Sequence, residues 1–219
     1  MNNLPFDPYD FFGYLASGLL VVVGMNLALG FPHVLGQDLK IVDSAVLLLA
    51  VYVVGQIIAT PAKALLEDGL VDRILGRPSI ILFREKKPRV RSLIFPGFYK
   101  PFPEQIRQKI LARATAEGID APGEALFLHV RYAPEVLNNE KLMAKLSSFI
   151  NKYGFTRNLA FTCLIVGIAL LVRVHFTPAA ELRKYAITAL VAAVLLLYRY
   201  LKFFRQYSYE MFNTYGGKK

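Results

Sequence analysis

The sequence predicts an all-α integral membrane protein, with four transmembrane helices in two hairpins and an α-rich cytosolic domain inserted between them. Hydrophobic residues make up 55% of the 219 residues, yet the formal net charge is +10. One chain can combine these two properties only if apolar and charged residues are segregated along it. They are segregated, because four segments contain no Asp, Glu, Lys, Arg or His: residues 11–30, 44–60, 159–172 and 185–198.

The first hairpin is expected within residues 1–62, with helices at about 11–30 and 43–61. A helix needs about 20 apolar residues to cross the hydrocarbon layer, with about 17 as the lower limit, and both segments reach that limit. No Lys or Arg precedes the first segment, whereas Asp7 and Asp10 do. Because a secretory signal peptide begins with basic residues, we interpret this segment as a retained membrane helix.

The second hairpin is expected within residues 158–204, with helices at about 157–176 and 183–204. Their uncharged stretches hold only 15 and 14 residues, which at about 1.5 Å per residue is roughly 21 to 22 Å. Basic side chains at the ends can extend toward the headgroups, and each helix then gains flanking apolar residues. A hairpin that packs in a soluble core, or that enters the bilayer only part way, stays open as the alternative.

The middle segment, residues 63–157, is strongly basic. It holds 17 of the 26 Lys and Arg residues but only 10 of the 16 Asp and Glu residues, a net charge of 17 − 10 = +7. Loops rich in Lys and Arg stay on the cytoplasmic side of a membrane. We therefore expect a cytosolic middle domain and cytoplasmic termini, an arrangement that leaves 22 basic residues inside and four in the outer connections.

Within the middle domain, an amphipathic helix is predicted for residues 62–75, directly after Pro61. Four prolines argue against a long helix in residues 78–103, where a short strand pair or an ordered loop is expected. A helix is predicted for residues 104–117, ending at Gly118. For residues 124–132 the pattern fits a strand or a helix, so a minor β content is left open.

Two helices are expected to continue between the membrane and the cytosol. Apolar residues at helical spacing lead from residue 142 into the third span, with Gly154 as the one flexible point. The fourth span continues into an aromatic and basic tail, residues 205–219. This tail is interpreted either as an interfacial anchor or as a segment that docks against the middle domain.

Two phrases, residues 151–158 (NKYGFTRN) and 200–207 (YLKFFRQY), resemble segments of uncharacterised bacterial multi-span membrane proteins, some of which are encoded with anti-phage defence genes. The resemblance implies a bacterial inner-membrane location and an effector that damages the membrane when signalled. It carries over no site residues.

A basic cluster is the strongest candidate binding site. Five basic residues occur within eight positions and only Glu85 opposes them: Arg84, Lys86, Lys87, Arg89 and Arg91. Near a cytoplasmic membrane face such a cluster attracts anionic lipid. The same side chains bind phosphate groups, so a phosphorylated ligand, a nucleotide or a nucleic acid is the alternative partner.

Further candidates lie in the first two spans. Asn26 and Gln56 are the polar side chains that need a partner in lipid, and Pro61 joins Gly154 as a hinge candidate. Small residues spaced by four allow helices to pack closely, within one protomer or between protomers of a homo-oligomer; these are Gly24, Ala28, Gly55 and Ala59.

The sequence shows no pattern of catalytic or metal-binding chemistry. It contains no HExxH, no P-loop and no GxSxG, and its single cysteine excludes an intramolecular disulfide. We therefore expect no enzyme, no cofactor and no metal. The expected function is that of an oligomeric membrane protein whose cytosolic domain senses a ligand or partner and whose spans respond as a pore or by disrupting the bilayer. The alternatives are a membrane adaptor that recruits a soluble partner, and a small channel or transporter subunit.

Overall fold

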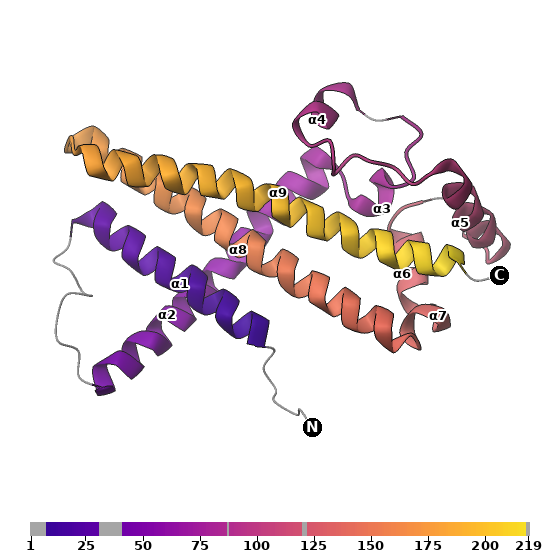
Figure 1. The fold of residues 1–219 in the computed structure, drawn as a ribbon, viewed down its shortest axis with the longest axis horizontal. Helices are drawn as coiled ribbons and strands as arrows, with labels where there is room; N and C mark the ends of the chain where they lie inside the picture. Colours follow the sequence, from indigo (N-terminus) through magenta and orange to yellow (C-terminus); the bar gives the residue numbers. More distant parts are fainter. Residues whose placement is uncertain (1–7, 31–40, 87, 120–121, 218–219) are drawn as a thin grey trace. The chain divides into compact units, whose positions relative to one another are not determined.

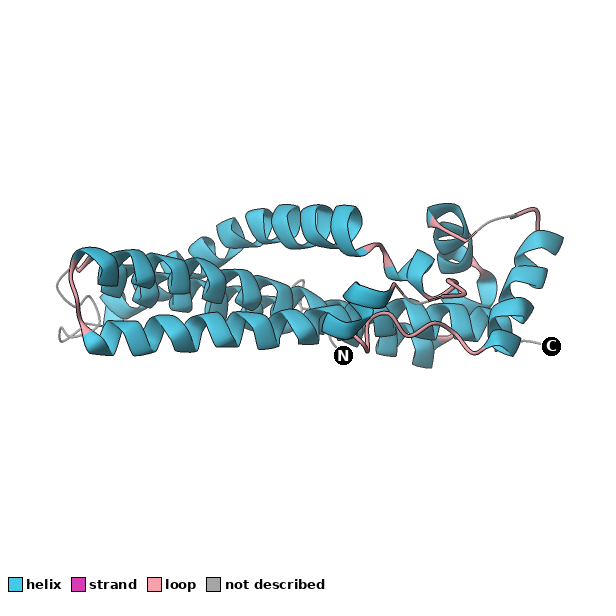
Figure 2. Cartoon of the chain, turned by 90° about the horizontal axis from the view of Figure 1, so that it is seen from above, coloured by secondary structure: helices cyan, strands magenta, loops and turns pink. Residues whose placement is uncertain are grey.

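The computed structural model describes residues 8–30, 41–86, 88–119 and 122–217, and these residues form helices and no strand (Figures 1 and 2). The helical class predicted from the sequence is thereby confirmed. In chain order the elements are α1 Pro8–Leu29, α2 Ile41–Ala62, η2 Lys63–Leu75, α3 Pro78–Ile81, α4 Arg89–Ile94, α5 Glu104–Ala116, α6 Glu124–Tyr132, α7 Pro134–Leu137, α8 Glu140–Phe176 and α9 Ala180–Gly217.

Within the described residues, four helices are long and apolar enough to cross a membrane: Phe11–Leu29, Val42–Ile81, Glu140–Phe176 and Ala180–Gly217. This agrees with the number of spans predicted. The third and fourth uncharged stretches are short, but they lie inside helices of 37 and 38 residues. The length of the helix therefore does not limit how far either one can reach.

Of the two alternatives for residues 78–103, a short strand pair or an ordered loop, the strand pair is wrong. Two short helices occur there instead, α3 and α4, and each starts beside a proline, at Pro78 and after Pro88. Proline suits the first turn of a helix because the N–H groups of that turn have no partner within the helix. Residues 124–132, left undecided above, form the helix α6, because Leu126 and Val130 are buried four residues apart on one face.

The helix continues through Pro61 without a break and then widens. In η2 the backbone makes π-type turns, as in the bond from the Gly76 N–H to the Val71 carbonyl at 2.6 Å, which spans five residues. The buried residues follow this wider spacing, at Ala62, Leu66, Val71 and Leu75. Leu65 and Ile74 are exposed.

The chain forms two compact units, each built from two parts of the sequence. Unit 1 comprises Met1–Asp68 and Gly154–Arg199, and unit 2 comprises Gly69–Tyr153 and Tyr200–Lys219. Both α8 and α9 contribute residues to each unit.

In unit 1, α1 packs against both α2 and α8. Along α1, Gly13 faces Phe155 and Gly24 faces Val166, so the residue numbers rise together and α1 runs parallel to α8. Against α2 the order is reversed, since Tyr14 meets Gly55 and Gly18 meets Val51. The two helices α1 and α2 therefore cross in opposite directions.

Unit 2 has a hydrophobic core to which the end of α9 contributes. Tyr207, Met211, Phe212 and Tyr215 are buried with residues of α5, α6, α7 and the start of α8. The ring of Phe212 meets that of Phe83 edge to face, with 5.0 Å between their centroids. Of the two interpretations of the tail, an interfacial anchor or docking against the middle domain, these side chains show docking. Rings that are buried in a protein core do not act as an interfacial anchor.

Candidate functional site

The basic cluster lies on and around α4 in unit 2. Lys86, Arg89 and Arg91 are exposed and Arg84 is partly buried, while Lys87 lies outside the described residues. The Tyr99 hydroxyl donates a hydrogen bond to the Leu75 carbonyl at 2.9 Å. Burial raises the pKa of Tyr99, and the charges of Arg91 and Arg84 act against this rise. The charges of Arg91 and Arg84 thus act on the Tyr99 hydroxyl, and the side chains of Lys86 and Arg89 are exposed.

The two polar candidates of the first spans have different surroundings. Gln56 is exposed on α2, where its Nε2 donates to the Tyr52 hydroxyl one turn earlier at 2.8 Å. Asn26 of α1 is partly buried, and among the described residues its Oδ1 has no hydrogen-bond partner. The buried Thr162 hydroxyl of α8 likewise has no hydrogen-bond partner among the described residues.

Glycines set the closest approach of α1 and α2. A Cβ atom on Gly18 would collide with the Val51 carbonyl oxygen and lie 2.9 Å from the Gly55 nitrogen. A Cβ atom on Gly55 would collide with the Tyr14 carbonyl oxygen. Backbone therefore touches backbone at this crossing. Gly55 was a packing candidate from the sequence, but Gly18 was not. Gly18 could have been found, because a glycine within an uninterrupted apolar segment indicates a place where helices pack closely.

The other packing candidates face their own chain. Gly24 faces Val166, and Ala28 is buried in a cluster with Val166, Leu170 and Ala186. Ala59 is partly buried. Of the two uses expected for the Gly24 and Ala28 pair, packing within one protomer is the one that these contacts support.

Both hinge candidates, Pro61 and Gly154, lie within continuous helix. The chain passes from α2 into η2 at Pro61, and Gly154 lies inside α8. A Cβ atom added at Gly154 would have nothing within 4 Å. Packing therefore does not require a glycine there, which leaves backbone flexibility as the property that distinguishes it.

A charged pair that the sequence did not predict lies in unit 1. Arg157 of α8 donates from Nη1 to Glu67 Oε2 at 2.6 Å, and the two side chains are only 12% and 18% exposed. The Arg157 guanidinium also contacts Asn158 Oδ1 at 3.3 Å. Arg157, the basic residue at the start of the third uncharged segment, thus has a carboxylate partner from η2.

A polar network in unit 2 joins α5, α6, α7 and α9. Glu117 accepts hydrogen bonds from Arg113 Nε and from the Tyr215 hydroxyl, both at 2.8 Å, and contacts His129 Nε2 at 2.6 Å. Arg113 also donates to the Tyr215 carbonyl at 2.6 Å and pairs with Glu135. We call these five residues the Glu117 network.

Hydrogen bonds from Arg113, His129 and Tyr215 lower the pKa of Glu117 to about 2. Burial and the bond to Glu117 raise the pKa of the Tyr215 hydroxyl. Both carboxylate oxygens of Glu117 are already occupied. The arrangement holds the end of α9 in place, and it leaves no oxygen of Glu117 directed at a substrate.

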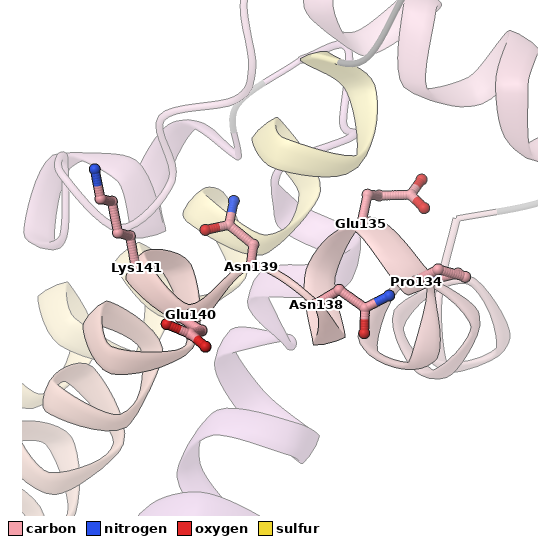
Figure 3. A pocket seen from close by; sticks show the side chains of 6 residues that line it. All are labelled: Pro134, Glu135, Asn138, Asn139, Glu140 and Lys141. Carbon is pink, nitrogen blue, oxygen red and sulfur yellow. The ribbon is translucent and has the colours of Figure 1, made fainter.

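An open pocket of about 510 Å³ lies at the turn between α7 and α8 (Figure 3). It is lined by Pro134, Glu135, Asn138, Asn139, Glu140 and Lys141. The Asn139 Oδ1 accepts the Leu142 N–H at 3.0 Å as a helix cap, and Glu135 pairs with Arg113. These two polar groups therefore serve the fold. Across the described ranges, no group of three His, Cys, Asp or Glu residues is arranged to hold a metal ion.

Comparison of the chain with protein-family models, with curated proteins and with solved structures gives no match.

Proposed function

We propose that this chain is a non-enzymatic, oligomeric protein of the bacterial inner membrane. In this proposal unit 2 is cytosolic and senses a ligand or partner, and the four spans respond by opening a pore or by disrupting the bilayer, as an antiviral effector would. The observation that carries the proposal is the continuity of α8 and α9, which run without a break from residues of unit 2 into the apolar segments of unit 1.

Continuity matters because one helix takes part in two packed cores. In α8, Leu142 and Leu146 are buried in the core of unit 2, while Val166 and Leu170 are buried in unit 1. A rotation or shift of α8 that follows binding at its first half therefore changes the face presented by its second half. The response requires a ligand that binds one arrangement of the helix better than the other.

The oligomeric part of the proposal is supported by Gln56. Its side chain is exposed on α2 among large exposed apolar residues such as Val53 and Ile57. A primary amide has two N–H donors and a carbonyl acceptor, and the Tyr52 hydroxyl accounts for only one donor. A remaining amide group facing lipid is costly, so the Gln56 face is expected to meet another copy of α2 or the water of a pore.

The direct test is leakage of a trapped dye from vesicles that contain the purified protein. Extract of phage-infected bacteria is added as the source of signal, with extract of uninfected cells as the control. Leakage with the first extract alone supports the proposal, and Gln56→Leu is expected to abolish it while Gln56→Asn retains part of it. Vesicles that keep their dye with both extracts, in the presence of correctly inserted protein, would contradict a pore or disruption function.

The second candidate function is an adaptor that recruits a soluble partner to the membrane. It is favoured by apolar side chains of unit 2 that the chain leaves exposed, namely Leu128, Tyr132, Leu137 and Met143. Co-purification of a cytosolic protein in a fixed ratio, lost in Leu128→Ser with Tyr132→Ser and without any leakage, would select this function over the first.

A further inference from the structure

The helix α4 combines exposed apolar and exposed basic side chains. None of its six residues is buried. Val90, Leu93 and Ile94 are 74%, 83% and 52% exposed. In Figure 1, α4 lies on a loop apart from α5, α6 and α7 of the same unit.

The positions of these residues on the helix are informative. Val90, Leu93 and Ile94 are spaced as i, i+3 and i+4, so they share one face. At about 100° per residue, Arg89 and Arg91 border this apolar face on its two sides. Ser92 lies opposite and its hydroxyl bonds back to the Arg89 carbonyl at 3.1 Å.

The base of the loop is held firmly although its tip is exposed. Phe98, Tyr99 and Phe102 are buried just after α4. The Tyr99 hydroxyl bonds to the Leu75 carbonyl, and the Phe102 N–H bonds to the Leu82 carbonyl at 2.9 Å. The chain that follows α4 is therefore held in place by packing and hydrogen bonds. The folded structure itself leaves the side chains of Val90, Leu93 and Ile94 exposed.

We propose that α4 is an interfacial helix that docks on an anionic lipid surface, with Val90, Leu93 and Ile94 entering the headgroup region and with Lys86 and Arg89 binding lipid phosphates. An apolar face bordered by cations on both sides is the pattern by which short helices lie in a membrane interface. The exposed cations Lys86 and Arg89 supply the complementary charge. A soluble phosphate ligand would satisfy the cations but would leave the three apolar side chains in water.

This inference deepens the proposed function, because it gives unit 2 a second attachment to the membrane besides the spans. A sensor held in this way changes state when α4 leaves the lipid surface. Its test must therefore report on α4 and on the spans separately.

The experiment places an environment-sensitive fluorophore on Leu93→Cys in a Cys163→Ala background, with one chain in each lipid nanodisc. Discs of phosphatidylcholine alone are compared with discs that also contain phosphatidylglycerol. In the anionic discs we expect the probe to be quenched by spin-labelled lipid and shielded from aqueous iodide. Each cation near such a surface changes binding about fivefold, so Lys86→Gln with Arg89→Gln is expected to lower the ratio of docked to undocked α4 about 25-fold.

Two control positions make the outcome decisive. A probe on Lys141→Cys, which is exposed elsewhere in unit 2, is expected to stay accessible to iodide in all discs. A probe on Leu195→Cys of α9 is expected to be quenched by lipid whatever the lipid charge, which tests the spans alone. If the Leu93 probe behaves like the Lys141 probe in anionic discs, the α4 inference is overturned, and the Leu195 probe then shows whether the membrane part of the proposed function survives.

Other occupants of the surface give different results. Protection of the Leu93 probe only when a disc holds two chains would assign the face to a second copy. Protection in neutral discs that requires added nucleic acid would assign it to a soluble phosphate ligand. Either result would overturn docking on lipid.

Discussion

Arg157 and Glu67 form an ion pair with 2.6 Å between Nη1 and Oε2, although they are 90 residues apart in the sequence. Arg157 is the basic residue at the start of the third uncharged segment, and Glu67 lies in the widened helix after Pro61. Each charge is mostly removed from water, so each depends on the other. The pair fixes η2 to α8 within unit 1.

Removal of this pair is expected to destabilise unit 1. Glu67→Gln leaves the Arg157 guanidinium without its carboxylate in a largely buried place, at a cost of about 2 kcal/mol. Unfolding of the protein in detergent measures this loss. The control is Asp68→Asn, which removes the same charge from the neighbouring, exposed position and is expected to change stability by less than about 0.5 kcal/mol. Equal effects of the two variants would show that Arg157 does not need Glu67.

The crossing of α1 and α2 predicts opposite effects for two Gly→Ala substitutions. Gly55→Ala places a methyl group against the Tyr14 carbonyl oxygen, and separation of the two backbones is expected to cost about 2 kcal/mol or more. Gly154→Ala meets nothing and is expected to stabilise the helix by about 0.8 kcal/mol. Thermal unfolding in detergent compares the two. A tolerated Gly55→Ala would mean that α1 and α2 do not meet at this point.

If Gly154 is the flexible point of α8, Gly154→Ala has a second effect. The variant is expected to keep full stability and membrane insertion but to leak less dye in the infected-extract assay, because its helix transmits a bend less readily. Phe176→Ala, an exposed position at the far end of α8, is the matched control and is expected to leak as the parent protein does. Unchanged leakage in Gly154→Ala would remove Gly154 as a hinge.

The lowered pKa of Glu117 predicts a specific pH dependence. Because this pKa falls from its ordinary value of 4.5 to about 2 in the folded protein, ionised Glu117 contributes stability at pH values above 4.5. That contribution disappears as the pH falls from 4.5 toward 2. The difference in Tm between the parent protein and Glu117→Gln should therefore be present at about pH 5 and should shrink as the pH falls toward 2.

A matched carboxylate separates this effect from general acid unfolding. Glu140→Gln changes an exposed residue at the start of α8 and is expected to alter Tm little at any pH in this range. A difference for Glu117→Gln that stays constant down to pH 2 would mean that the hydrogen bonds from Arg113, His129 and Tyr215 do not depend on the charge of Glu117.

The burial of Phe212 predicts that the end of α9 is essential to unit 2. Its ring is completely buried against Phe83, so Phe212→Ala is expected to cost about 3 to 5 kcal/mol. Resistance to proteolysis measures the loss, with Tyr132→Ala as the control, because Tyr132 is mostly exposed. A tail that served only as an interfacial anchor would give little change for Phe212→Ala in detergent.

Much of the fold could be predicted because it depends on local composition. Residues 11–30 and 44–60 are apolar over the length that a span requires, and the helix at 104–117 is bounded by Pro103 and Gly118. The error at residues 78–103 arose because prolines exclude long helices but permit short ones. At residues 124–132 a nine-residue segment was too short for its pattern to distinguish a helix from a strand.

The candidate site was less predictable because its partners are distant in the sequence. The basic cluster is contiguous and was found, but the exposure of the apolar face of α4 depends on how the chain packs around it, with Phe98, Tyr99 and Phe102 buried after the helix. The Glu117 network joins residues up to 102 positions apart. Gly18 could be recognised as small, but the carbonyl oxygen that it must approach belongs to another helix.

Charge and apolar length along the chain are properties of single residues and their neighbours. The helices long and apolar enough to cross a membrane, the helical class and the basic character of the middle segment therefore follow from the order of amino acids alone. Which side chains pair is a property of packing. Arg157 with Glu67, Gly18 with the backbone of α2, and Tyr215 with Glu117 were decided only when the folded helices brought distant surfaces into contact, because hydrogen bonds and steric fit act over a few ångströms.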